Sequence, residues 1–168
     1  MGGVPAVVPG VSQWGTLANW GERAVAFLLD LVIVAVPAIV LYIIAFIFGT
    51  FSTALFVLFA FIAWAYSIVV GLYVVGWQNG LGGSPGKKIT GLRLIGEETG
   101  QPIGGGMGIA RYFAHIVDSI ICYIGWLFPL WDPKRQTIAD KIMKTVVTTG
   151  NPKTDFATAV KSVIPGQS

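Results

Sequence analysis

Two long stretches of the chain consist almost entirely of apolar residues. Residues 24–48 contain a single charged residue, Asp30, and residues 54–77 contain none. At about 1.5 Å of rise per residue, each stretch forms a helix longer than the ~30 Å hydrocarbon core of a bilayer. The pattern therefore predicts two transmembrane helices joined by a short polar turn at residues 49–53.

A third apolar stretch, residues 109–131, is interrupted by polar residues and helix breakers. Its first half contains Arg111, His115 and Asp118, and its second half contains a glycine and a proline. Charged side chains are costly in the centre of a bilayer, and glycine and proline interrupt helices. We therefore expect an element that enters the membrane and returns, or that lies in the interface; a third full crossing with paired charges is the alternative.

The remaining segments are polar or rich in glycine and proline. Residues 1–19 predict a flexible N-terminus, residues 20–149 a single membrane domain, and residues 150–168 a polar C-terminal tail. The fold class predicted is an all-α membrane protein, with two long transmembrane helices, a third re-entrant or transmembrane element, and a small cytoplasmic β-hairpin or sheet.

The β-hairpin is predicted within the polar, glycine-rich segment that follows the second span. Residues 89–95 alternate loosely between apolar and polar positions, a Glu-Glu-Thr-Gly turn follows, and residues 101–103 suit a short second strand. The β-branched run at residues 145–149 predicts a further strand, which pairs with the strand around Leu92 if the C-terminal tail lies on the same side of the membrane.

The distribution of basic residues predicts the orientation in the membrane. The turn between the two spans contains no Lys or Arg, whereas the segment after the second span contains Lys87, Lys88 and Arg93. The positive-inside rule therefore places the N-terminus and that segment in the cytoplasm. The basic C-terminal tail obeys the same rule only if it is also cytoplasmic, which favours the re-entrant third element.

The composition is typical of a membrane protein, which we expect in the cell (inner) membrane. It also argues against several classes of function. The chain is 54% hydrophobic and 11% charged, about half the charged fraction usual in soluble domains. A net charge of +3 with scattered basic residues predicts contact with the lipid bilayer and no nucleic-acid binding. Catalytic and metal-binding motifs are missing, and Cys122 is the only cysteine, so we expect no enzyme activity, cofactor or metal site.

Two groups of ionisable residues are candidate sites within the apolar stretches. Arg23 and Asp30 are seven residues apart and share one helix face, so Asp30 is either a functional group or a packing device neutralised by a cation from another element. Arg111, His115 and Asp118 form a polar stripe at helical spacing. The stripe predicts a proton or cation path, or the solvated face of an interfacial helix, which is the interpretation we favour.

The glycine-rich sequence at residues 82–88 superficially resembles a phosphate-binding loop. It departs from that motif because Leu81 replaces the first glycine, Lys88 replaces the Ser or Thr, and Pro85 removes a backbone donor. We expect a rigid turn that presents Lys87 and Lys88 to lipid headgroups or to an acidic partner.

The order of several motifs resembles the RDD family of prokaryotic membrane proteins. The matching segments are Glu-Arg-Ala-Val-Ala-Phe-Leu-Leu-Asp at 22–30, Gly-Ser-Pro-Gly-Lys-Lys-Ile-Thr-Gly-Leu-Arg-Leu at 83–94, Ala-Arg-Tyr at 110–112, and Lys-Arg-Gln-Thr-Ile-Ala-Asp-Lys-Ile-Met-Lys-Thr-Val-Val at 134–147. The resemblance implies that Arg23 and Asp30 are the family's arginine and first aspartate. Asp140 fits the second aspartate best, with Asp118 as the weaker match, which implies a charge cluster of Arg23, Asp30 and Asp140.

Two functions are compatible with these features. The first is a non-catalytic accessory or assembly subunit that packs on other membrane-protein subunits or on itself. The alternative is a transporter, such as a cation/proton antiporter, since the RDD resemblance implies a proposed role in transport. A pathway from two or three elements is thin, so the transporter is expected to act as a homo-oligomer.

Overall fold

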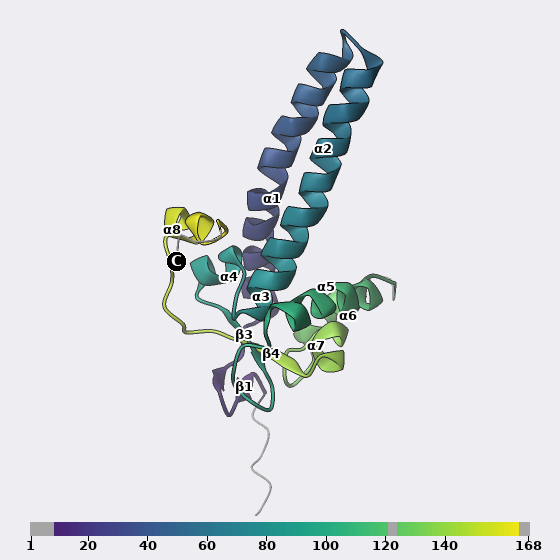
Figure 1. Cartoon of the computed structure of the whole chain (residues 1–168). Helices are drawn as coiled ribbons and strands as arrows, with labels where there is room; N and C mark the ends of the chain where they lie inside the picture. Colours follow the sequence, from purple (N-terminus) through teal and green to yellow (C-terminus); the bar gives the residue numbers. More distant parts are fainter. Residues whose placement is uncertain (1–8, 121–123, 165–168) are drawn as a thin grey trace, which may run out of the picture.

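A hairpin of two long helices dominates the computed structural model, which describes residues 9–120 and 124–164 (Figure 1). The first helix, α1, covers Trp20–Gly49, and α2 covers Thr53–Gly71. The second continues through a π-helical segment, η1 (Leu72–Trp77), into the short α3 (Gln78–Gly80). Both helices are long and apolar enough to span a membrane, so the two predicted helices are confirmed, with the length and composition that a crossing requires.

The surface of the hairpin is suited to lipid. Large apolar side chains such as Phe46, Phe61 and Val69 are more than half exposed, at 71%, 61% and 65%. The residues buried in α1 are mainly small: Ala26, Ala38 and Ala45. Small side chains let the two helices approach closely while the large ones face outward, as expected in a bilayer.

A short helix follows α3 and packs across α1 near its start. This helix, α4, covers Pro85–Thr90, and Gly91 ends it in the left-handed conformation at φ +74°. Gly86 lies at the crossing, where a Cβ would collide with the carbonyl oxygen of Ala26. The expected strand at residues 89–95 is therefore wrong in its first part, because residues 89–90 complete a helix.

The small sheet predicted for the polar region is present with a different partner strand. Strand β3 (Arg93–Gly96) pairs antiparallel with β4 (Thr145–Thr148), and Arg93 lies opposite Thr148. The pairing of the run at 145–149 with this region is thus confirmed. The predicted hairpin is wrong, because residues 101–103 form no strand and β4, about fifty residues later, takes that place.

The N-terminal segment is structured in part, although a flexible lead-in was expected. Strands β1 (Val11–Ser12) and β2 (Gly15–Thr16) form a small hairpin, and Leu17 bridges to Thr148 of β4. Leu17 is fully buried with Ile95 and Val146. Apolar packing against the sheet therefore anchors residues 9–19, while residues 1–8 lie outside the described part of the chain.

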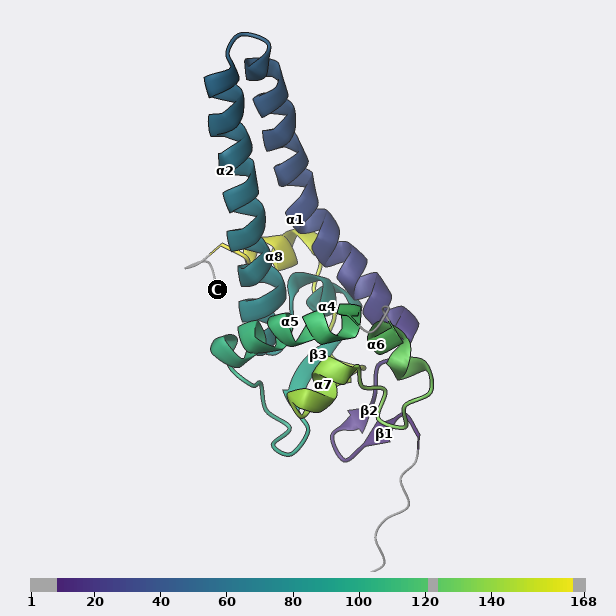
Figure 2. The same ribbon diagram turned by 90° about the vertical axis from the view of Figure 1, so that its right-hand side faces the viewer.

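The third apolar stretch forms a bent element. Helix α5 (Gly105–Ile120) lies across the base of the hairpin (Figures 1 and 2). Helix α6 (Ile124–Leu127) and the 3-10 helix η2 (Phe128–Leu130) run at 108° to α5. Close backbone contacts fix α5 in place, since a Cβ on Gly108 would overlap the carbonyl oxygen of Gly76.

Two short helices complete the base. Helix α7 (Ile138–Ile142) packs beside α5 and leads directly into β4, and α8 (Phe156–Lys161) packs on α4. The described parts of the N-terminal and C-terminal segments therefore lie at the same end of the helix hairpin, opposite its turn (Figure 1).

Candidate functional site

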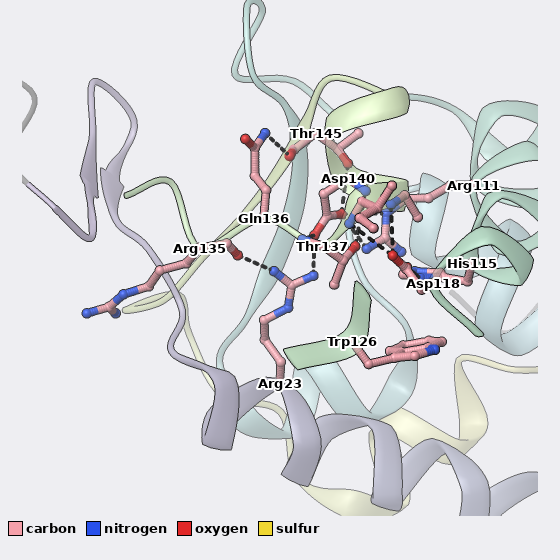
Figure 3. Close-up of polar contacts among 12 residues, drawn as sticks. Arg23, Arg111, His115, Asp118, Trp126, Arg135, Gln136, Thr137, Asp140 and Thr145 are labelled. Atoms are coloured by element: carbon pink, nitrogen blue, oxygen red, sulfur yellow. Dashed lines mark hydrogen bonds and ion pairs between the residues drawn. The ribbon is translucent and has the colours of Figure 1, made fainter. Parts of the chain in front are cut away.

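The carboxylate of Asp140 is the centre of a buried ion-pair network at the base (Figure 3). Arg111 of α5 donates to Asp140 Oδ1 from Nη2 at 2.5 Å and from Nε at 2.9 Å. Arg23 of α1 donates from Nη2 to Oδ2 of the same carboxylate. One aspartate therefore joins two helices that are distant in sequence.

Local hydrogen bonds hold Asp140 in this position. The side chain of Thr137 caps α7 by accepting from Asp140 N at 3.1 Å, and Thr137 N donates back to Asp140 Oδ2 at 3.1 Å. The hydroxyl of Thr145 in β4 donates to Oδ1 at 3.0 Å. This reciprocal capping box holds the side chain in the position where the two arginines bind it.

Electrostatics keep Asp140 charged although it is fully buried. Burial alone raises the pKa of a carboxyl group, but the guanidinium groups of Arg111 and Arg23 outweigh that effect and hold the pKa of Asp140 well below its usual range. Asp140 is thus an anion throughout the physiological pH range, and it neutralises cations that are themselves nearly buried.

Arg23 also connects the start of α1 to the segment before α7. Its Nη1 donates to the carbonyl oxygen of Arg135 at 2.6 Å. A capping box between Asn19 and Glu22 begins α1 at Trp20, which places Arg23 in the first turn. The cap and the ion pair together fix where the transmembrane helix meets the polar base.

The polar stripe of α5 faces this network. Arg111 and Asp118 are 4% and 0% exposed, and His115 Nδ1 lies 2.5 Å from Asp118 Oδ2. The favoured interpretation of a solvated stripe is wrong, because the stripe points inward. The outer face of α5 is apolar instead, with Phe113 and Ile120 more than half exposed.

Asp118 binds the N-terminus of α7, and His115 packs on an aromatic ring. Asp118 Oδ1 accepts from Ile138 N at 2.9 Å and from Ala139 N at 3.3 Å, which satisfies free amides of that helix end. The ring of His115 stacks on Trp126 at a centroid distance of 4.3 Å. Both residues therefore have structural roles in joining α5, α6 and α7.

Asp30 lies apart from the Arg23–Asp140 pair. Its Oδ1 accepts from Gly86 N at 2.7 Å, so it fastens α4 to α1. Asp30 lines a cavity of about 410 Å³ together with Arg23, Lys87, Arg111 and His115. The cluster implied by the family resemblance is thus split into a bonded pair, Arg23 and Asp140, and a carboxylate facing the same cavity.

The two lysines of α4 have neighbours within the chain. Lys87 lines the cavity, and burial with the nearby charge of Arg111 lowers its pKa to about 8, although Asp30 opposes the shift. The ammonium of Lys88 donates to Gln78 Oε1 at 3.2 Å and to Ser162 Oγ at 3.2 Å. Contact of either lysine with headgroups or a partner stays a prediction.

Sequence reasoning did not single out three residues of this region. Thr137 caps α7, and Trp126 stacks on His115. Asn79 lines the cavity. Thr137 and Asp140 have the spacing of a capping box, which marks a helix start and was detectable. The other two depend on long-range packing that carries no local signal.

The comparison with protein families matches residues 17–144 to the model of the RDD family. The chain belongs to the RDD family. Arg23, Asp30, Asp118 and Asp140 all lie within the matched residues, and the choice of Asp140 or Asp118 as the second family aspartate stays a prediction.

Related proteins include two mycobacterial antigens. This RDD protein is 49% identical over 88 residues to the proline-rich antigen homolog of Mycobacterium tuberculosis. The matched segment covers 52% of this chain and 33% of that protein. It is 48% identical over 99 residues to the proline-rich antigen of Mycobacterium leprae, covering 58% of the chain and 40% of that protein. The chain thus spans well under half the length of these two relatives.

A Bacillus subtilis relative is of similar length. Protein YxaI, whose name describes it as uncharacterized, is 33% identical over 146 residues, covering 77% of this chain and 95% of that protein. These names state no activity, ligand or partner. No solved structure matches the chain.

Replacing Asp140 tests the ion-pair network. Asp140→Asn keeps the shape of the side chain but leaves two guanidinium groups without a buried anion, so we expect a loss of about 3–5 kcal/mol of unfolding free energy. The measurement is denaturant unfolding of the purified protein in detergent micelles. Glu98→Gln, which removes an exposed carboxylate paired with Lys144, is the matched control and is expected to change stability by less than about 1 kcal/mol.

The pH dependence of unfolding checks the same assignment. Because the pKa of Asp140 is depressed, its stabilising contribution is present above the ordinary carboxyl value of 3.8 and is lost as the pH falls toward the folded-state value. The wild-type protein should therefore lose stability in acid more steeply than Asp140→Asn. Two results contradict the network. One is an unfolding free energy that falls with pH equally steeply in the wild type and in Asp140→Asn, and the other is equal stability of Asp140→Asn and Glu98→Gln at neutral pH.

Proposed function

We propose that this RDD protein is a non-catalytic membrane module that works by associating with other membrane-protein subunits or with a second copy of itself. The observation that carries the proposal is that buried carboxylates of the base bind donors from neighbouring helices. Asp140 and Asp118 are each engaged by donors from neighbouring elements, so these buried carboxylates serve to fasten helices together. A rigid polar base on a lipid-facing hairpin suits assembly better than chemistry.

The proposal includes an orientation. The hairpin of α1 and α2 crosses the inner membrane, its turn lies outside, and the base with both terminal segments lies in the cytoplasm. The basic residues Lys87, Lys88 and Arg93 support this, because they lie at the base while the turn has none. Helix α5 then lies in the interface, with Phe113 and Ile120 toward lipid and Arg111 toward the base.

Cysteine labelling tests this orientation. In a Cys122→Ser background, Thr50→Cys in the turn should react with a membrane-impermeant maleimide in intact cells. Lys153→Cys in the exposed tail segment should react only after the membrane is opened. Reaction of both cysteines in intact cells is the result that rejects a cytoplasmic tail and an interfacial α5.

A glycine at the end of α2 has room beside it for a larger side chain, although the chain covers the glycine itself. Gly71 is buried, yet a Cβ built on it meets no atom of another element within 4 Å, whereas one on Gly76 already approaches Ile109 Cγ1 at 3.2 Å. Gly76 is therefore used inside the chain, whereas Gly71 leaves room beside it. Membrane helices associate through such small residues, because they let backbones approach.

Substitution at this glycine tests the assembly role. Native mass spectrometry after mild detergent extraction should find the wild-type protein in a complex, and Gly71→Leu should shift it toward the single chain. Gly106→Leu is the control, because a Cβ there also meets nothing within 4 Å but lies on α5. A wild-type protein that is always a lone chain opposes the proposal.

A second candidate function is cation/proton exchange by a homo-oligomer. The observation that favours it is Asp30, a carboxylate within a membrane-spanning helix that lines the 410 Å³ cavity. Intramembrane carboxylates commonly handle ions or protons. A pathway formed by two or three elements is thin, so this candidate requires several copies of the chain.

Asp30→Asn tests the transport candidate. The substitution keeps an acceptor for Gly86 N while removing the charge. Vesicles containing the wild-type protein should show a pH change driven by a cation gradient, and the variant should lose it. Unchanged exchange in the variant removes Asp30 from the mechanism, and no exchange in the wild type rejects transport.

A further inference from the structure

The cavity at the base lies where α1, α4 and α5 meet, and it has two kinds of wall. Basic side chains from all three helices line one part: Arg23, Lys87 and Arg111. Apolar and aromatic side chains line the rest, among them Phe27, Val75 and Trp126. Its volume of about 410 Å³ falls in the range of small-molecule sites and is much larger than a single water requires.

The charges that face the cavity have an excess of cations. Asp30 is the one carboxylate among its lining residues, and its Oδ1 is bound to Gly86 N. Asp118 and Asp140 lie behind the wall, where backbone amides and the two arginines engage them. His115 also lines the cavity and is bound to Asp118.

Donors on the cationic wall are free to bind a ligand. Within residues 9–120 and 124–164, the Lys87 ammonium forms no ion pair, and Arg111 uses only Nε and Nη2, which leaves Nη1 free. An unpaired ammonium and a free guanidinium N–H group lining one cavity are unfavourable unless an anion or water binds them.

A buried amide among the lining residues has an unused oxygen. Asn79 is 2% exposed and lines the cavity, and its Oδ1 has no hydrogen-bond partner in the described chain. Leaving a buried polar atom unpaired is costly, so native proteins rarely do so. The NH₂ group of the same side chain is a donor that an anion in the cavity would bind.

We propose that this cavity binds a phosphate group, as the monoester or diester headgroup of an amphiphile. Lys87, Arg111 Nη1 and Asn79 supply the hydrogen-bond donors, and Arg23 adds positive charge. Phosphate suits a site that combines guanidinium and ammonium donors. Phe27, Val75 and Trp126 provide an apolar surface for the neighbouring part of the molecule.

The position of the cavity fits a headgroup from the cytoplasmic leaflet. Arg23 lies in the first turn of α1, and Asp30 lies two turns deeper, so the cavity covers the depth at which headgroups meet hydrocarbon. A soluble phosphate binds the same donors in the same way as a lipid headgroup. The experiment below separates these two sources of phosphate. Binding here goes beyond the proposed assembly role and does not depend on it, whereas the choice of the cytoplasmic leaflet rests on the proposed orientation.

The test uses the full-length protein in nanodiscs and in detergent. Native mass spectrometry compares phospholipid retained from mixed phosphatidylglycerol and phosphatidylcholine nanodiscs, and thermal unfolding in detergent measures the shift caused by inorganic phosphate. The variants are Lys87→Gln, which removes the free cation, and Asn79→Asp, which adds negative charge at constant shape. Lys153→Gln removes an exposed lysine outside the cavity and is the matched control.

The wild type and Lys153→Gln should retain phosphatidylglycerol, and the two cavity variants should retain about tenfold less at equal monodispersity. Stabilisation of the wild type by inorganic phosphate alone, lost in Lys87→Gln, assigns the site to a soluble phosphate. Two results overturn the proposal: binding of neither probe, or equal binding by Lys87→Gln and Lys153→Gln.

Discussion

The structure depends on a single carboxylate that cannot be buried alone. Asp140 is fully buried, and Arg23 and Arg111 reach it from helices on either side. Burying either guanidinium group without this carboxylate would also be unfavourable. The three groups therefore stabilise one another only when α1, α5 and α7 are assembled. Because Arg23 lies in the first turn of a membrane-spanning helix, the same contact fixes the polar base against the end of the hairpin.

Several other features follow from this constraint. Helix α5 turns its polar stripe inward to reach Asp140 and α7, which leaves an apolar outer face and explains why a stretch with three ionisable residues is compatible with a bilayer interface. Helix α7 leads directly into β4, and β4 pairs with β3, so the ion pairs and the sheet position the C-terminal segment together. The cavity lies where α1, α4 and α5 meet in this assembled base.

Local patterns in the sequence were sufficient for the two spans, because length and lack of charge decide them without any tertiary contact. They failed at residues 89–90, where a loose alternation suggested a strand but Gly86 packs against α1 and Gly91 ends a helix. The family resemblance indicated Arg23 with Asp140, whereas nothing in the sequence indicated that Arg111 shares that carboxylate. The two residues are 29 positions apart and meet only through the bend after α5.

The most direct test of this account is a double-mutant cycle between Arg23 and Asp140, measured as unfolding free energy in detergent micelles. Arg23→Met and Asp140→Asn should each be strongly destabilising. The double variant should cost less than their sum by about 2 kcal/mol or more, since removing one partner already loses the interaction. Additivity within about 0.5 kcal/mol shows that the two residues do not interact and contradicts the account.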